Sequence, residues 1–153
     1  MKYWLFKTEP NTYSLDDLKN EPNQTTYWEG IRNYAARNYL RDGVKKGDRV
    51  LIYHSIVKPP QIVGTAKVVK EAYPDHFAFD ESNPYFDPKS NPNNPRWLMV
   101  DIQYASHFKT PVTLDEIKKT PGLENMVLLK IGRLSIQPVT QKEWEILVKM
   151  GNR

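Results

Sequence analysis

DRVLIYH at residues 48–54 and QIVGTAKVVKEAY at residues 61–73 are rich in β-branched and aromatic residues. Such a composition is typical of strands, and the short connection with Pro59 and Pro60 makes the two runs neighbours in one sheet. Gly64 lies inside the second run, where a glycine predicts a bulge or a bend. These two runs therefore predict the centre of a β-sheet, around which the rest of the chain is arranged.

Three further runs extend this sheet: residues 2–7 (KYWLFK), 96–104 (RWLMVDIQY) and 134–139 (LSIQPV). Each combines apolar, β-branched and aromatic residues over a strand's length. The segment 80–96 holds four prolines and four asparagines. Because proline breaks helices and central strands, this segment is predicted to be a long loop.

Short helices are predicted at the margins of the sheet. Residues 33–40 predict a helix, since Ala36, Tyr39 and Leu40 share one face. Three other helix starts have the spacing of a capping box: Ser14 with Asp17, Thr113 with Glu116, and Thr140 with Glu143. This order predicts one domain over residues 1–153, of mixed α/β (α+β) class, with a mostly antiparallel, closed or half-closed sheet.

Composition excludes several classes of protein. The chain has no cysteine, which excludes disulfides, thiolate zinc sites and cysteine nucleophiles. No apolar run approaches the roughly 20 residues that span a bilayer, and the N-terminus lacks the pattern of a signal peptide. We therefore expect a cytoplasmic monomer without a membrane partner, or a nuclear protein if the source is eukaryotic.

Charge is distributed unevenly around a net value of +4. Residues 32–49 contain six basic residues against two acidic ones, whereas the charged residues in 75–88 are all acidic. One interpretation is a surface that contacts nucleic-acid phosphates, through Arg37, Arg41, Lys45 and Lys46. The other interpretation is two solvated faces of opposite charge.

Templates for catalysis are absent. The histidines His54, His76 and His107 have no metal-binding spacing, so no metal site is expected. Ser55 follows His54, but adjacent strand residues point to opposite faces, and no G-x-S-x-G elbow surrounds the serine. No glycine-rich phosphate loop is present, and no cofactor is expected. The sequence therefore predicts a binding protein that is not an enzyme.

Aromatic and amide side chains are the chemistry that remains. Four Trp, nine Tyr and five Phe offer flat faces on which a nucleobase can stack, and amides can read its edge. Most aromatic residues fill cores, and we expect Trp4, Trp97 and Trp144 to do so. Trp28 differs, because it starts a cluster of carboxylate, guanidinium and amide groups at residues 28–34 that would be costly to bury unless paired or used on a ligand.

Ordered blocks of the chain resemble one family. They are YWLFKTEP at 3–10, WEGIRNY at 28–34, ARN at 36–38, GD at 47–48, YHS at 53–55, IVG at 62–64, YPD at 73–75, PRW at 95–97, MVD at 99–101 and RLSIQPV at 133–139. Together they resemble the EVE domain family from residue 3 to about residue 147. The resemblance implies a PUA-like β-barrel with short flanking helices, and a non-catalytic role in recognising modified bases, chiefly modified cytosine in DNA.

The resemblance also implies pocket residues, through kinship with YTH domains, which hold methylated adenine in an aromatic cage. Lys7 and Thr8 stand where YTH domains have a Lys-Ser pair, and Asn38 stands where they have a base-contacting Asn. Arg32 takes the place of a cage tryptophan. A pocket closed by Trp28 and polar groups is therefore expected in place of a methyladenine cage.

We predict that a base flipped out of the helix enters one pocket. Its predicted residues are Lys7, Thr8, Trp28, Arg32, Asn33, Asn38, Tyr53, His54, Ser55 and Tyr85. Two alternatives stay open. One is an RNA-binding protein or nuclease of the PUA-like group, with His54 as general base. The other is a pocket for a small metabolite.

Overall fold

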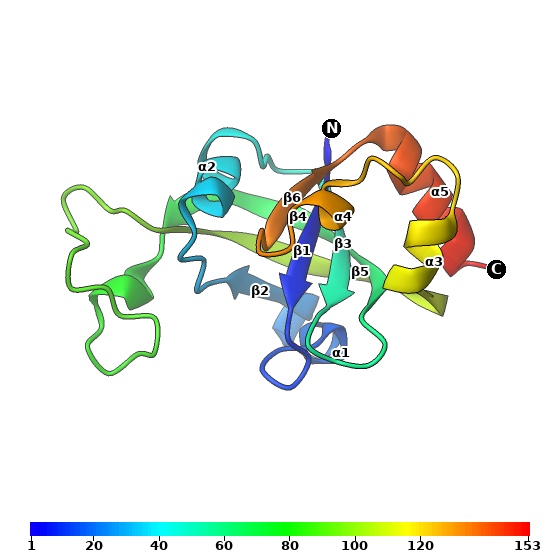
Figure 1. Cartoon of the computed structure of the whole chain (residues 1–153). Helices are drawn as coiled ribbons and strands as arrows, with labels where there is room; N and C mark the ends of the chain where they lie inside the picture. Colours follow the sequence, from blue (N-terminus) through cyan, green and yellow to red (C-terminus); the bar gives the residue numbers. More distant parts are fainter.

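Six strands form one sheet in the computed structural model, which describes residues 1–153 (Figure 1). They are β1 (Tyr3–Thr8), β2 (Thr25–Trp28), β3 (Arg49–His54), β4 (Gln61–Pro74), β5 (Leu98–Thr113) and β6 (Ile136–Val139). Their order is β2-β5-β4-β3-β1-β6, and all neighbours are antiparallel except β1 and β3, which are parallel. The predicted α+β class with a mostly antiparallel sheet is confirmed.

The predicted central strands β3 and β4 are neighbours, and Gly64 lies at a register shift in β4. A Cβ atom at Gly64 would lie 2.2 Å from the carbonyl oxygen of Ser106 in β5. Glycine therefore lets the two backbones approach closely at this bend. Further register shifts occur along β4 and β5, the two longest strands, and such irregularities bend a sheet and increase its twist.

The sheet is not closed into a barrel, because the edge strands β2 and β6 do not pair with each other. Helix α2 (Tyr34–Asp42) contacts β4, β5 and β6. Its residues Ala36 and Leu40 are buried in the same core as Trp28 of β2 and Ile136 of β6. A helix satisfies its own backbone hydrogen bonds, so α2 can cover this core without adding a strand to the sheet.

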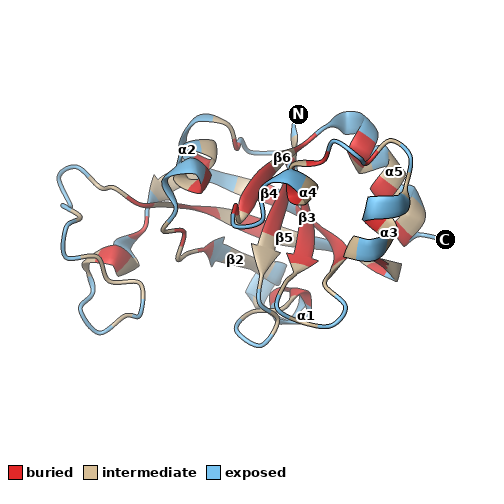
Figure 2. Ribbon diagram, viewed as in Figure 1, coloured by how far each residue is buried: buried red, intermediate tan, exposed pale blue.

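Both faces of the central strands β1 and β3 are buried, because consecutive residues of each strand are buried. Figure 2 shows most of β3 in the colour of buried residues. Along β1, Trp4 and Phe6 face a core that includes α2, while Leu5 faces a second core. This alternation is the period of two that a strand imposes. The second core contains Ile117 of α3 (Leu114–Lys119), Leu128 of α4 (Val127–Lys130) and Leu147 of α5 (Gln141–Gly151).

The helix starts agree with their sequence signals. All three predicted capping boxes are present, at the starts of α1 (Leu15–Lys19), α3 and α5. Strand β2 was not predicted, because its four residues follow the short 3-10 helix η1 (Pro22–Gln24) and only Trp28 is buried. Residues 80–96 follow a second 3-10 helix, η2 (His76–Phe79), and contain no helix or long strand. None of the helices is long and apolar enough to cross a membrane.

Candidate base-binding site

A cavity of about 720 Å³ lies at the ends of β1 and β2, where the loop of residues 80–96 reaches back to the sheet. This volume lies within the roughly 300–1,000 Å³ that is usual for ligand pockets. The cavity is lined by Lys7, Thr8, Glu9, Thr12, Tyr13, Glu21, Thr26, Tyr27, Trp28, Glu29, Gly30, Ile31, Asn83, Pro84, Tyr85 and Ser135. Four of the predicted pocket residues are therefore brought together: Lys7, Thr8, Trp28 and Tyr85.

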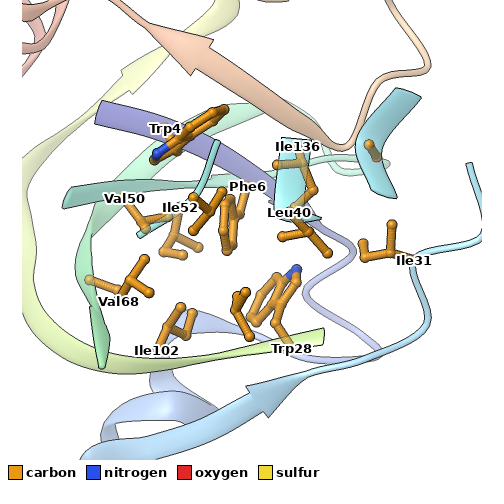
Figure 3. Close-up of a cluster of buried hydrophobic side chains, with 14 of the residues drawn as sticks. Trp4, Phe6, Trp28, Ile31, Leu40, Val50, Ile52, Val68, Ile102 and Ile136 are labelled. Carbon is orange, nitrogen blue, oxygen red and sulfur yellow. The ribbon is translucent and has the colours of Figure 1, made fainter. Parts of the chain in front are cut away.

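Trp28 contributes to the cavity wall and to the core at the same time. Its side chain lies among Phe6, Leu40 and Ile102 (Figure 3) and the residue is only 7% exposed. Its ring centroid lies 5.7 Å from that of Phe6 and 6.0 Å from that of Tyr13. Trp28 is therefore a rigid wall held by other aromatic rings, with little of its own face open to a ligand.

Tyr85 forms another wall of the cavity. Unlike Trp28, which belongs to a strand and to the core, it comes from the loop of residues 80–96, and its ring packs on the backbone of Gly30. A Cβ atom at Gly30 would lie 2.6 Å from Cζ of Tyr85, so the ring rests directly on this glycine. Gly30 also has a φ of +79°, a conformation that residues with side chains rarely adopt. Gly30 is therefore required both for the turn after β2 and for the position of the Tyr85 ring.

An ion pair between the buried Asp75 and the partly buried Arg32 fixes the loop behind Tyr85. Asp75 is fully buried and accepts hydrogen bonds from the backbone N–H of Gly30 at 3.1 Å and from Nη1 of Arg32 at 3.0 Å. Arg32 also donates from Nε and Nη2 to the carbonyl oxygen of Tyr85. Its guanidinium lies 5.6 Å from the Tyr85 ring centroid and 5.5 Å from that of Trp97. Arg32, predicted in the pocket, is not in the cavity wall and instead positions Tyr85.

The cavity wall carries more acidic than basic groups. Glu9, Glu21 and Glu29 line it, whereas Lys7 is its one basic residue. Lys7 donates from Nζ to the carbonyl oxygen of Gly132 at 2.7 Å, and burial lowers the pKa of its amine. Burial also raises the pKa of Tyr13 in this wall to about 12. A phosphate group would meet an unfavourable field in the cavity, whereas a neutral base would not.

Asn33 and Asn38 are not in this cavity, which corrects the prediction that they read the base there. Asn33 is exposed and caps α2, where its side chain accepts a hydrogen bond from the N–H of Ala36 at 3.0 Å. Asn38 is exposed on the same helix and accepts a hydrogen bond from Nε of Arg37. Asn38 lines a separate cavity of about 670 Å³ between α2 and β1.

Three predicted residues at the end of β3 also lie outside the cavity wall. Tyr53 is buried in the second core. The backbone N–H of Ser55 donates to the carbonyl oxygen of Thr8 at 3.0 Å. Nε2 of His54 accepts a hydrogen bond from the N–H of Leu15 at 3.2 Å, and burial lowers the pKa of this imidazole. His54 thus caps the first turn of α1, and the nitrogen that a general base would use is occupied.

The predicted phosphate-contacting residues lie on α2 and in the turn after it. Arg37 donates to the carbonyl oxygen of Arg96 and lies 4.9 Å from the ring centroid of Tyr34. Arg41 forms an ion pair with Asp42 at 2.8 Å, and Lys45 lies 4.0 Å from Glu71. Lys46 is exposed. Two of these four cations are therefore partly compensated by carboxylates, and their role towards phosphates remains a prediction.

Sequence reasoning missed the parts of the site that depend on distant segments. Asp75 was only one member of an acidic run, although it holds Gly30 and Arg32, more than 40 residues away. Glu29 was one of the polar groups beside Trp28, and its place in the cavity wall was not predicted. No group of three or more His, Cys, Asp or Glu side chains lies close enough to hold a metal ion.

Known proteins resemble the chain over nearly its whole length. Residues 2–150 match the EVE domain family. The chain is 45% identical to thymocyte nuclear protein 1 of Homo sapiens, over 99% of this chain and 74% of the relative. It is 46% identical to the protein of the same name from Gallus gallus, over 97% of this chain and 68% of the relative.

Solved structures agree with this assignment. The human THYN1 protein in complex with 5-methylcytosine-containing DNA superimposes with a TM-score of 0.94 at 43% identity, covering 100% of this chain and 99% of that one. A hypothetical protein from Leishmania major gives a TM-score of 0.93 at 42% identity, covering 99% of this chain and 94% of that one. The resemblance predicted from the sequence blocks is thus confirmed, and the chain belongs to the EVE domain family.

Proposed function

We propose that this protein binds DNA that carries 5-methylcytosine, and that the modified base turns out of the helix into the cavity between Trp28 and Tyr85. The observation that carries this proposal is the match, over the whole chain, to the human THYN1 protein solved with such DNA. The cavity supports it, because a nucleobase can stack on the Tyr85 ring while Trp28 closes the inner end.

The charge of the cavity wall favours a base over a phosphate as the group that enters. Three glutamates and one lysine line the cavity. The phosphates would remain outside, beside the cations of α2 and the following turn, two of which are partly compensated by carboxylates. In a eukaryotic cell this function would place the protein in the nucleus.

A binding role is favoured over the nuclease alternative. The nuclease needs a general base, and the candidate His54 uses Nε2 to accept the N–H of Leu15. We therefore propose that the chain recognises the base and leaves it chemically unchanged.

Binding of matched duplexes tests this function. A duplex with one 5-methylcytosine should bind about fivefold more tightly than the same duplex with cytosine, because burial of one methyl group contributes roughly 1 kcal/mol. The affinity for both should fall steeply between about 50 and 200 mM salt, since phosphate contacts release counterions. Fluorescence anisotropy measures both quantities. Equal affinity with and without the methyl group would contradict the proposal, and salt-independent binding of the duplexes would contradict contacts with the phosphates.

A further inference from the structure

Glu29 presents an unused hydrogen-bond acceptor at the cavity. The residue directly follows β2 and lies in the cavity wall beside Trp28 and Gly30. Its Oε2 atom is buried and accepts no hydrogen bond. Burial raises the pKa of the Glu29 carboxyl, and the charge of Asp75 adds to this effect, whereas His76 and Arg32 oppose it. Buried polar atoms are normally paired, so a lone acceptor at a cavity wall requires an explanation.

The backbone N–H of Gly30 and the basic side chains of Arg32 and Lys7 donate to other acceptors. The N–H of Gly30 donates to Asp75. Arg32 donates to Asp75 and to the carbonyl oxygens of Tyr85 and Ile31. Lys7, the basic residue in the wall, donates to Gly132. The Glu29 carboxyl is therefore free to accept a hydrogen bond from a group bound in the cavity.

We propose that the Glu29 carboxyl accepts a hydrogen bond from the exocyclic amine of the bound base, which makes the cavity selective for amino-bearing bases over keto-bearing ones. This inference rests on the proposed function. Cytosine carries an N4 amine, and glutamate is a suitable acceptor for it. Thymine carries an O4 acceptor at the same place, and two acceptors facing each other repel. Glu29 thus distinguishes 5-methylcytosine from thymine, although both rings carry the same methyl group.

The test compares 5-methylcytosine with thymine, each placed opposite an abasic site so that no base pair has to be broken. The wild-type protein should prefer 5-methylcytosine by about tenfold or more. In Glu29→Gln the preference should fall to near one, because the amide can turn either its oxygen to an amine or its NH₂ to a keto oxygen. In Glu29→Ala the affinity for 5-methylcytosine should fall. Glu145→Gln changes an exposed carboxylate of α5, outside the cavity, and should keep the wild-type preference.

Thermal melting provides the matching control for folding. Glu29→Gln should melt at the same temperature as the wild type or higher, because it removes a carboxylate that has no partner in the protein. If both Glu29 variants are folded and keep the wild-type preference for 5-methylcytosine over thymine, the role of Glu29 is overturned. That result would leave the proposed function intact, provided that wild-type protein still prefers 5-methylcytosine duplexes to cytosine duplexes.

Discussion

Asp75→Ala is expected to lower the free energy of unfolding by about 3–5 kcal/mol, since it removes a buried carboxylate and leaves its Arg32 partner, which is only 22% exposed, without a counter-charge. The carboxylate is fully buried and accepts hydrogen bonds from Gly30, Arg32 and Phe77. Arg32 would lose its ion pair, and the turn after β2 would lose an anchor. Urea denaturation followed by tryptophan fluorescence measures the loss.

Asp42→Ala is the matched control for this prediction. Asp42 also pairs with an arginine, Arg41, but both side chains are largely exposed. Its removal should leave the urea midpoint nearly unchanged, because exposed ion pairs are screened by solvent. Equal effects of the two substitutions would show that the Asp75 pair does not anchor the wall of the cavity.

Tyr85→Ala is expected to weaken binding of 5-methylcytosine DNA by about 1–3 kcal/mol, or roughly 5- to 150-fold, which is the usual contribution of one base stacked on an aromatic ring. The fold should tolerate this change. Arg32 donates to the backbone carbonyl of Tyr85, which alanine retains, and the Arg32 guanidinium keeps its contact with Trp97. Anisotropy titrations at constant salt measure the loss of affinity.

Tyr104→Ala is the control for loss of a tyrosine elsewhere on the sheet. Tyr104 lies on β5, contacts His107 and is absent from the cavity wall. Its replacement should leave the affinity for DNA within about twofold of the wild type, which is under 0.5 kcal/mol. If the Tyr85 variant binds DNA as tightly as the Tyr104 variant, Tyr85 is not part of the binding site.

Much of the fold could be predicted because its signals are local. The capping boxes at Ser14, Thr113 and Thr140 need only residues three positions apart, and all three start helices. Strands β3 and β4 have enough β-branched residues to be recognised alone. Closure of the sheet could not be predicted, because it depends on whether the edge strands β2 and β6, which are far apart in the sequence, pair with each other. That outcome is decided by tertiary packing.

The site was predictable only in part, for the same reason. Trp28 and Tyr85 were expected at one pocket, and the structure brings both to one cavity. The amide chemistry of Asn33 and Asn38, and for Asn38 the resemblance to YTH domains, predicts a place in the pocket, but Asn33 caps α2 and Asn38 is exposed on that helix. The cluster at residues 28–34 indicated where polar groups gather. Which of them stays unpaired depends on Asp75, a neighbour only in the folded chain.

Base extrusion is the central claim, and the affinity of paired and mispaired 5-methylcytosine tests it most directly. Extrusion is easier from a mismatch, because fewer interactions are lost when the base leaves the stack. The wild-type protein should therefore bind 5-methylcytosine opposite adenine about tenfold more tightly than opposite guanine, at equal salt. Equal affinity for the two duplexes would mean that the base stays in the helix, and would contradict the role assigned to the cavity between Trp28 and Tyr85.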